Sequence, residues 1–244
     1  MGLHFLPAAC VRVGRVAALS LLFAGAVLLA ACQTAPVMKP PPVLAPLSPL
    51  TTQNTAHYSI QPALSDVRFL VYRAGPLAGF GHNHVIQAAH IQGDIYLGAD
   101  LQRSGFTLNL PVKDLQVDAP QARAVEGPDF ATQPSAPAVQ GTYTNMLGAG
   151  ELDAATYPDI RIRSVGFTGP EWGPDATVRI ELHGVARELT VPIALEQRGE
   201  FLIATGAFEI RQSDFGIRPF SILGGGLQVA DSVKVRFHLV AQKD

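Results

Sequence analysis

Between His57 and the end of the chain, apolar and polar side chains alternate with a period of two residues in one segment after another. Because successive side chains of a strand point to opposite faces of a sheet, this pattern predicts strands with one apolar and one polar face. The apolar rows fall within residues 67–71, 91–97, 106–112, 160–162, 178–182, 189–195, 201–210 and 233–239. We therefore predict an all-β fold with an antiparallel sheet of about eight strands. A barrel is favoured, because closing a sheet removes its exposed edges.

Residues 118–157 interrupt this pattern with a stretch that is rich in Ala, Gly and Pro. Within it, Ser135 followed by Ala136-Pro137 is typical of a helix start, with Ser as the N-cap and Pro in the first turn. Gly148 is placed to end that helix. Its expected inner face consists of Val139, Thr142, Tyr143 and Met146. We expect a short helical or irregular insertion that lies across one opening of the barrel.

The N-terminal segment has the composition of a secretory signal. Arg12 and Arg15 precede an apolar run from Val16 to Ala31, and residues 1–31 contain no acidic residue. The run is shorter than the roughly 20 residues that a transmembrane helix needs. Its end, Leu29-Ala30-Ala31-Cys32, resembles the bacterial lipoprotein box. This resemblance implies that residues 1–31 are a lipoprotein signal peptide and that Cys32 is lipidated.

Residues 32–56 read as a Pro-rich tether, which connects Cys32 to a domain over residues 57–244. Its composition does not allow enough apolar burial for independent folding. Where it is polyproline-like it extends by ~3.1 Å per residue, so that it spans on the order of 70 Å. We expect a lipid-anchored periplasmic protein. Gln33, rather than Asp, after Cys32 favours the outer membrane over the inner one, by resemblance to known lipoprotein sorting.

Charge and cysteine content exclude several function classes. Of 18 basic and 20 acidic residues, residues 1–31 hold two basic ones, which leaves a net charge of −4 with His neutral. A nucleic-acid-binding protein normally carries a stripe of basic residues, and this sequence shows none. The domain contains no cysteine, which excludes disulfides and thiolate chemistry within it. It also lacks a Gly-x-Ser-x-Gly elbow, a His-Glu-x-x-His motif and a Gly-Lys-Ser phosphate loop, so we expect no enzyme.

Gly81-His82-Asn83-His84 is the sharpest local motif. On a strand, His82 and His84 point to the same face and can meet one metal ion, a haem or an acidic head group. A metal site needs a further ligand, for which the candidates are His183, His57, His90, Asp94 and Asp66. If the glycines make a turn, the two rings diverge. The alternative is a pair of polar histidines at a barrel mouth, bonded to the backbone.

Two further motifs lie at expected turns. His183, in Leu182-His183-Gly184-Val185, is a head-group or metal candidate, and the alternative is a histidine whose hydrogen bonds are satisfied in a tight turn. Arg211 and Asp214 stand three residues apart beside Gly216, where they are placed to pair and fix a corner. Such a motif is more often a structural turn than an active site.

Several pieces together resemble the YceI-like family of periplasmic lipid-binding proteins. They are Tyr58-Ser59-Ile60, Val67-x-Phe69, Gly93-x-Ile95, Tyr157-Pro158-x-Ile160-x-Ile162-x-Ser164, Leu182-His183-Gly184-Val185-Ala186-Arg187, Arg211-x-Ser213-Asp214-Phe215-Gly216-Ile217 and Ser232-Val233. Their order holds from about residue 58 to residue 242. The resemblance implies a lipocalin-like antiparallel barrel with an elongated apolar cavity, and polyisoprenoid or other long-chain amphiphilic ligands. The Gly81-His82-Asn83-His84 stretch replaces the family's Gly-x-Phe-like segment.

These observations favour a tethered binding protein for a long-chain amphiphile, namely a polyisoprenoid, an isoprenoid quinone or a fatty-chain lipid. The residues expected to line its cavity are Phe69, Phe106, Leu108, Ile162, Leu182, Phe208 and Phe237. The expected partners are this lipid and, through Cys32, the membrane; self-association as a homodimer is left open. The alternative is a metal- or haem-binding envelope protein that uses His82 and His84. A third hypothesis is an envelope scaffold with an empty cavity.

Overall fold

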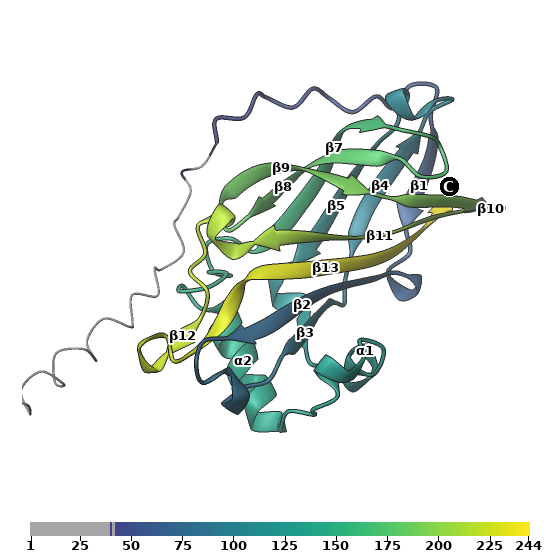
Figure 1. Cartoon of the computed structure of the whole chain (residues 1–244). Coiled ribbons are helices and arrows are strands. Elements are labelled where there is room, and N and C mark those ends of the chain that lie inside the picture. The colour runs from purple at the N-terminus through teal and green to yellow at the C-terminus, as the bar shows by residue number, and fades with distance from the viewer. Residues whose placement is uncertain (1–39, 41) are drawn as a thin grey trace, which may run out of the picture. The chain divides into compact units, whose positions relative to one another are not determined.

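The computed structural model describes residue 40 and residues 42–244 (Figure 1). The strands are β1 (Ala56–Ile60), β2 (Asp66–Ala74), β3 (His84–Ala88), β4 (Gln92–Leu97), β5 (Gly105–Pro111), β6 (Leu115–Val117), β7 (Asp159–Thr168), β8 (Asp175–Leu182), β9 (Val185–Pro192), β10 (Ala194–Arg198), β11 (Phe201–Arg211), β12 (Ser221–Ile222) and β13 (Leu227–Lys243). The α-helices are α1 (Pro120–Ala124) and α2 (Ala136–Leu147). Short 3-10 helices are η1 (Pro62–Leu64), η2 (Ala78–Phe80), η3 (Leu101–Arg103), η4 (Val112–Asp114), η5 (Pro128–Phe130), η6 (Gln212–Phe215) and η7 (Leu223–Gly225). The all-β prediction is confirmed.

The strands form one antiparallel sheet in the order β6-β3-β2-β13-β1-β4-β5-β7-β8-β9. The long strand β13 lies between β2 and β11 (Figure 1), and it pairs with β1, β2, β11 and β12. Within the described residues, β9 and β11 lie side by side, but no hydrogen-bonded ladder joins them. The sheet therefore wraps around its interior without the full closure that a barrel predicts.

Two residues show how β9 and β11 meet. Pro192 ends β9 and has no N–H to donate to a ladder. Opposite it, Gly206 of β11 leaves room for the close approach, because a Cβ on Gly206 would lie 2.6 Å from the Pro192 carbonyl oxygen. The expected apolar row of residues 189–195 is consequently split into β9 and β10, and β10 forms a hairpin with β11.

The predicted number of about eight strands is too low, since the sheet has 13. Strands β3, β6 and β12 contain 5, 3 and 2 residues. Such runs are too short to show a clear period of two. They form because neighbouring strands supply hydrogen-bond partners, a tertiary effect that local alternation does not reveal.

Helix α2 agrees with the sequence prediction. The Ser135 Oγ accepts a hydrogen bond from the Ala138 N–H at 3.4 Å, Pro137 lies in the first turn, and Gly148 is the C-cap. Val139, Tyr143 and Met146 pack against the main core. The Tyr143 hydroxyl donates to the Lys113 carbonyl at 2.8 Å, which attaches the helix to the segment before β6. The helix is thereby fixed at one end of the wrapped sheet.

The described part of the tether is not free. Residues 42–55 contain no helix or strand, but they lie along the outside of the sheet. Arg179 donates to the Ala45 carbonyl at 2.7 Å, Arg163 donates to the Ser48 carbonyl, and Arg187 donates to the Pro40 carbonyl at 3.1 Å. Guanidinium groups therefore hold this part of the predicted tether against the domain by satisfying its backbone carbonyls.

The predicted signal peptide and Cys32 lie outside the described residues. Within residues 40 and 42–244, no helix has the length and apolar character to cross a membrane.

Candidate functional site

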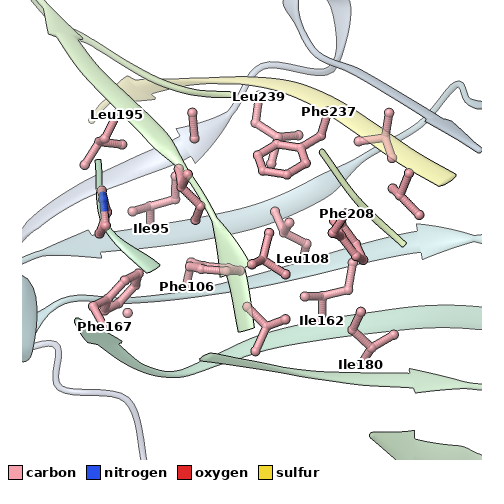
Figure 2. Close-up of a pocket in the computed structure, with 18 of the residues that line it drawn as sticks. Ile95, Phe106, Leu108, Ile162, Phe167, Ile180, Leu195, Phe208, Phe237 and Leu239 are labelled. Carbon is pink, nitrogen blue, oxygen red and sulfur yellow. The ribbon is translucent and has the colours of Figure 1, made fainter. Parts of the chain in front are cut away.

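An apolar cavity, here called the first chamber, lies inside the wrapped sheet (Figure 2). Its wall includes all seven residues expected from the sequence, namely Phe69, Phe106, Leu108, Ile162, Leu182, Phe208 and Phe237. The only polar side chain on this wall, among the described residues, belongs to Ser104. The Ser104 Oγ already accepts from the Gly98 N–H at 3.0 Å and donates to the Asp100 carbonyl at 3.1 Å. The first chamber thus presents carbon surface to a ligand.

Strand register explains how these side chains converge. Leu108, Ile162 and Ile180 are direct partners across β5, β7 and β8, so they form one row on the inner face. On the opposite side, the Phe208 and Phe237 rings meet edge to face with centroids 6.3 Å apart. Figure 2 shows these five side chains directed into the same space. Alternation along each strand thereby turns an apolar row into a cavity wall.

Sequence reasoning missed part of this wall. Ile95, Phe167, Ile180 and Leu195 also line the first chamber (Figure 2). Ile95, Ile180 and Leu195 belong to the predicted apolar rows, so the same alternation could have identified them. Phe167 lies near the end of β7, beyond the recognised row, and its ring centroid is 6.2 Å from that of Phe106.

A second chamber adjoins the first under helix α2. The two share Phe69, Ile160, Leu182 and Ile210 on their walls. The first chamber holds about 1210 Å³ of space between atoms and the second about 1010 Å³, each partly open to solvent. Because they share four lining residues, the two chambers are neighbouring parts of one interior space.

The second chamber differs from the first in polarity. Its polar side chains are His84, Thr142, Asn145, Glu151 and Gln212, and no Lys or Arg is among its described lining residues. Burial raises the pKa of Glu151 to about 7. The pair of chambers therefore joins an apolar space to one with hydrogen-bonding groups.

His82 and His84 lie together rather than apart. Their ring centroids are 4.6 Å from each other, so the alternative in which a glycine turn makes the two rings diverge does not apply. The third member of the cluster is Asp118, which follows β6 and whose Oδ2 lies 2.7 Å from the His84 Nδ1. One nitrogen or oxygen atom from each of the three lies within 4.8 Å of the others. This is a candidate metal centre.

Burial and neighbouring groups shift the pKa values of His82 and Asp118. The His82 Nε2 is buried and has no hydrogen-bond partner, and burial together with the neighbouring His84 lowers the pKa of His82. Burial alone would raise the pKa of Asp118, but hydrogen bonds from His84 and the Val85 N–H outweigh it and lower that pKa. A neutral imidazole and an ionised carboxylate are the forms that bind metals.

The third ligands suggested by the sequence lie elsewhere. His57 contacts Asp94 at 3.0 Å, His90 contacts Asp114 at 3.0 Å, and Asp66 pairs with Arg68 at 2.7 Å. Among the described residues, none of them joins the cluster of His82, His84 and Asp118. Asp118 was missed because its segment shows no strand pattern, and only the pairing of β3 with β6 brings it close to His84.

His183 occupies a tight turn between β8 and β9. Its φ angle is +52° and that of Gly184 is +73°. The His183 Nδ1 lies 3.4 Å from the Phe215 carbonyl oxygen, and its ring stacks edge to face on Tyr157 with centroids 5.0 Å apart. These contacts fit the structural alternative for His183, and they do not bring it to the candidate metal centre.

The corner at residues 211–217 is fixed by contacts that the sequence did not predict. The Ser213 Oγ donates to the Asp231 Oδ2 at 2.6 Å, and the Ser213 N–H donates to the Asp231 Oδ1 at 2.8 Å. The Arg187 Nε donates to the Asp214 carbonyl at 2.6 Å. Asp231 was missed because it lies in β13, 18 residues further along the chain.

A sheet wrapped around an apolar cavity defines a lipocalin-like class of fold, in which strands surround a ligand space. The family model described as the YceI-like domain matches residues 58–241. Since this match spans most of the chain, the protein belongs to the YceI-like family, as the sequence motifs predicted. Comparison with curated proteins finds no match.

Two solved structures share the fold. Burkholderia cenocepacia BcnA is 17% identical, with a TM-score of 0.55, over 75% of this chain and 99% of that chain. A polyisoprenoid-binding domain from Saccharophagus degradans, implicated in plant cell wall breakdown, is 12% identical, with a TM-score of 0.53, over 77% of this chain and 98% of that chain. At these identities the likeness shows the fold alone.

Proposed function

We propose that this protein binds a long-chain amphiphile, with the apolar chain inside the first chamber. The observation that carries the proposal is the cavity wall, in which Ser104 is the one polar side chain from residues 42–244 and is already hydrogen-bonded. The polyisoprenoid-binding function of the Saccharophagus degradans domain supports the same ligand class. The ligand classes are a polyisoprenoid, an isoprenoid quinone or a fatty-chain lipid, and the role is binding without a catalytic step.

Burial of a hydrocarbon chain supplies sufficient free energy for such binding. Each buried methylene contributes ~0.8 kcal/mol, so ten contribute about 8 kcal/mol before the cost of ordering the ligand. Micromolar binding needs about 8 kcal/mol net, so a chain longer than ten methylenes has to be buried to offset the ordering cost as well.

The proposal includes a place in the cell. Residues 1–31 have the composition of a lipoprotein signal, and acylation of Cys32 would anchor the domain in the periplasm, on the outer membrane. The ligand would then be taken up and released near one membrane surface. Globomycin treatment of the expressing cells tests the anchor, because blocked signal cleavage should leave a heavier precursor.

Ligand binding is tested with a pair of substitutions on β11. Ala204 lines the first chamber, whereas Ala207 is exposed. Ala204→Phe should fill the cavity and reduce the lipid recovered by solvent extraction and mass spectrometry of the purified protein. Ala207→Phe should leave that amount unchanged. The proposal is wrong if no apolar molecule co-purifies with the unmodified protein, or if Ala204→Phe retains a full complement.

A second function, metal binding, is favoured by the convergence of His82, His84 and Asp118. The unpartnered, buried His82 Nε2 is the free ligand atom, and the contact of Asp118 with the His84 Nδ1 would orient that ring. Elemental analysis of untagged protein tests this function. A stoichiometric metal should be present, should vanish in His82→Ala/His84→Ala, and should persist in a control, His90→Ala, at an exposed site. A metal-free protein after equilibration with zinc would refute it.

A further inference from the structure

The second chamber determines which polar head group the ligand can carry. Four residues are common to both chambers, so a chain that fills the first has its end beside the second. The polar side chains of the second chamber include Glu151, Gln212 and Asn145, and its described wall contains no Lys or Arg. A head group that ends there therefore meets hydrogen-bonding groups but no cation.

Glu151 is the central group of this chamber. It follows helix α2, it is partly buried, and no ion pair involves it among the described residues. Because burial raises its pKa to about 7, the carboxyl group is largely a neutral acid below that pH. In this form it can donate an O–H to a ligand oxygen.

Among the described residues that line the chamber, no other group supplies a fixed positive charge. His84 is the second titratable residue on the wall, and its Nδ1 is held by Asp118. Behind it, Arg123 is buried and donates to Asp118 at 2.5 Å and to the Asn83 carbonyl at 2.8 Å. Gln212 donates from its Nε2 to the Ala230 carbonyl at 2.8 Å, so its side-chain oxygen is the part left to contact a ligand.

Helix α2 adds an independent argument against anions. The helix covers residues 136–147, and the residues with which it lines the chamber are Thr142, Asn145 and Met146. These lie in its C-terminal half, where the helix dipole is negative. Phosphate sites use helix N-termini, arginine or lysine instead.

We propose that the ligand is a long-chain isoprenoid with an uncharged oxygen head group, held in the second chamber by Glu151, and that its phosphorylated counterpart is discriminated against. This inference rests on the proposed lipid-binding function and deepens it. A quinone carbonyl or an alcohol oxygen accepts the Glu151 proton in a hydrogen bond. A phosphate would instead face a carboxyl group and a helix C-terminus.

Farnesol and farnesyl diphosphate test the inference, since they share one chain and differ only in the head group. Calorimetric titration of the delipidated full-length protein at pH 6 should give at least about tenfold tighter binding for farnesol. Equal or tighter binding of the diphosphate would overturn the inference while leaving lipid binding intact. If neither compound binds and no lipid co-purifies, the proposed function itself fails, and the inference fails with it.

Substitution of Glu151 separates head-group recognition from chain burial. Farnesol affinity of the unmodified protein should fall about tenfold between pH 6 and pH 8, as the acid form is lost. Glu151→Gln keeps a neutral hydrogen-bond donor, so its farnesol affinity should no longer depend on pH. This variant retains His84, so the comparison isolates Glu151. Glu151→Lys should improve diphosphate binding. Glu171→Gln, on an exposed turn, is the control. A pH dependence that persists in Glu151→Gln would overturn the role of Glu151.

Discussion

The buried Arg123 side chain links three segments of the chain beside the candidate metal centre. Its guanidinium donates to Asp118 at 2.5 Å, to the Thr132 carbonyl at 2.5 Å and to the Asn83 carbonyl at 2.8 Å. It thereby joins the α1 region to the start of β3 and to the end of β6. Asp118 in turn accepts from the Val85 N–H and contacts His84. This network holds Asp118 against His84 and so fixes the position of that ring.

We predict that Arg123→Met destabilises the protein by about 3–5 kcal/mol, because it leaves the Asp118 carboxylate buried without its cation. Urea unfolding followed by circular dichroism measures the loss. The double variant Arg123→Met/Asp118→Asn should be more stable than Arg123→Met, since no uncompensated charge remains. An Arg123→Met protein as stable as the unmodified one would contradict the role of this pair.

Glu151 makes a prediction for stability as a function of pH. Its pKa rises from 4.5 to about 7 on folding, so the folded protein binds the proton more tightly than the unfolded chain. Its contribution to the free energy of unfolding should therefore fall as the pH rises from 4.5 to 7, and then level off. Because part of the carboxyl group still contacts solvent, we expect about 1–2 kcal/mol.

Urea unfolding of the unmodified protein and of Glu151→Gln, at pH 5 and at pH 7.5, isolates this contribution. The variant should lose less stability over this interval than the unmodified protein. Identical pH profiles for the two proteins would show that Glu151 titrates normally in the folded state.

At the scale of elements, the junction of β9 and β11 depends on a glycine. A Cβ on Gly206 would lie 2.6 Å from the Pro192 carbonyl oxygen and 2.5 Å from an atom of the Phe237 ring. We predict that Gly206→Ala separates the two strands and costs about 1–3 kcal/mol, measured as a fall in the thermal midpoint. Gly166→Ala in β7 is the matched control, because a Cβ there meets nothing within 4 Å. Equal effects of both substitutions would contradict the proposed contact.

Elements with local signals were predictable from the sequence, and those that depend on distant partners were not. Ser135, Pro137 and Gly148 determine α2 through capping, which is a property of adjacent residues. The inner faces of β5 and β7 follow from alternation, and so do most of the cavity residues. The approach of Asp118 to His84 depends on the pairing of β6 with β3, and no pattern near Asp118 encodes it. The open junction of β9 and β11 at Pro192 likewise depends on a residue that is distant in the sequence, Gly206.

At the scale of the whole molecule, the tether and the sheet form one unit through arginines on β7, β8 and β9. We predict that Arg163→Ala/Arg179→Ala releases residues 42–55 and makes them several times more sensitive to limited proteolysis, because their carbonyls lose these donors. Arg161→Ala, whose side chain is exposed on the same strand as Arg163, should leave cleavage unchanged. Unchanged cleavage of the double variant would show that the docking contributes nothing.

The length and position of β13 have a consequence for folding. This strand of 17 residues pairs with β1, β2, β11 and β12, and its partners in β1 lie up to 185 residues earlier in the chain. Pairings at such sequence distance form slowly, because the loop between the strands must close first. The sheet cannot be completed before residues 227–243 have been synthesised. Until then the chain lacks the strand that joins β1, β2 and β11, and the part of the cavity wall that Val235, Phe237 and Leu239 form is missing.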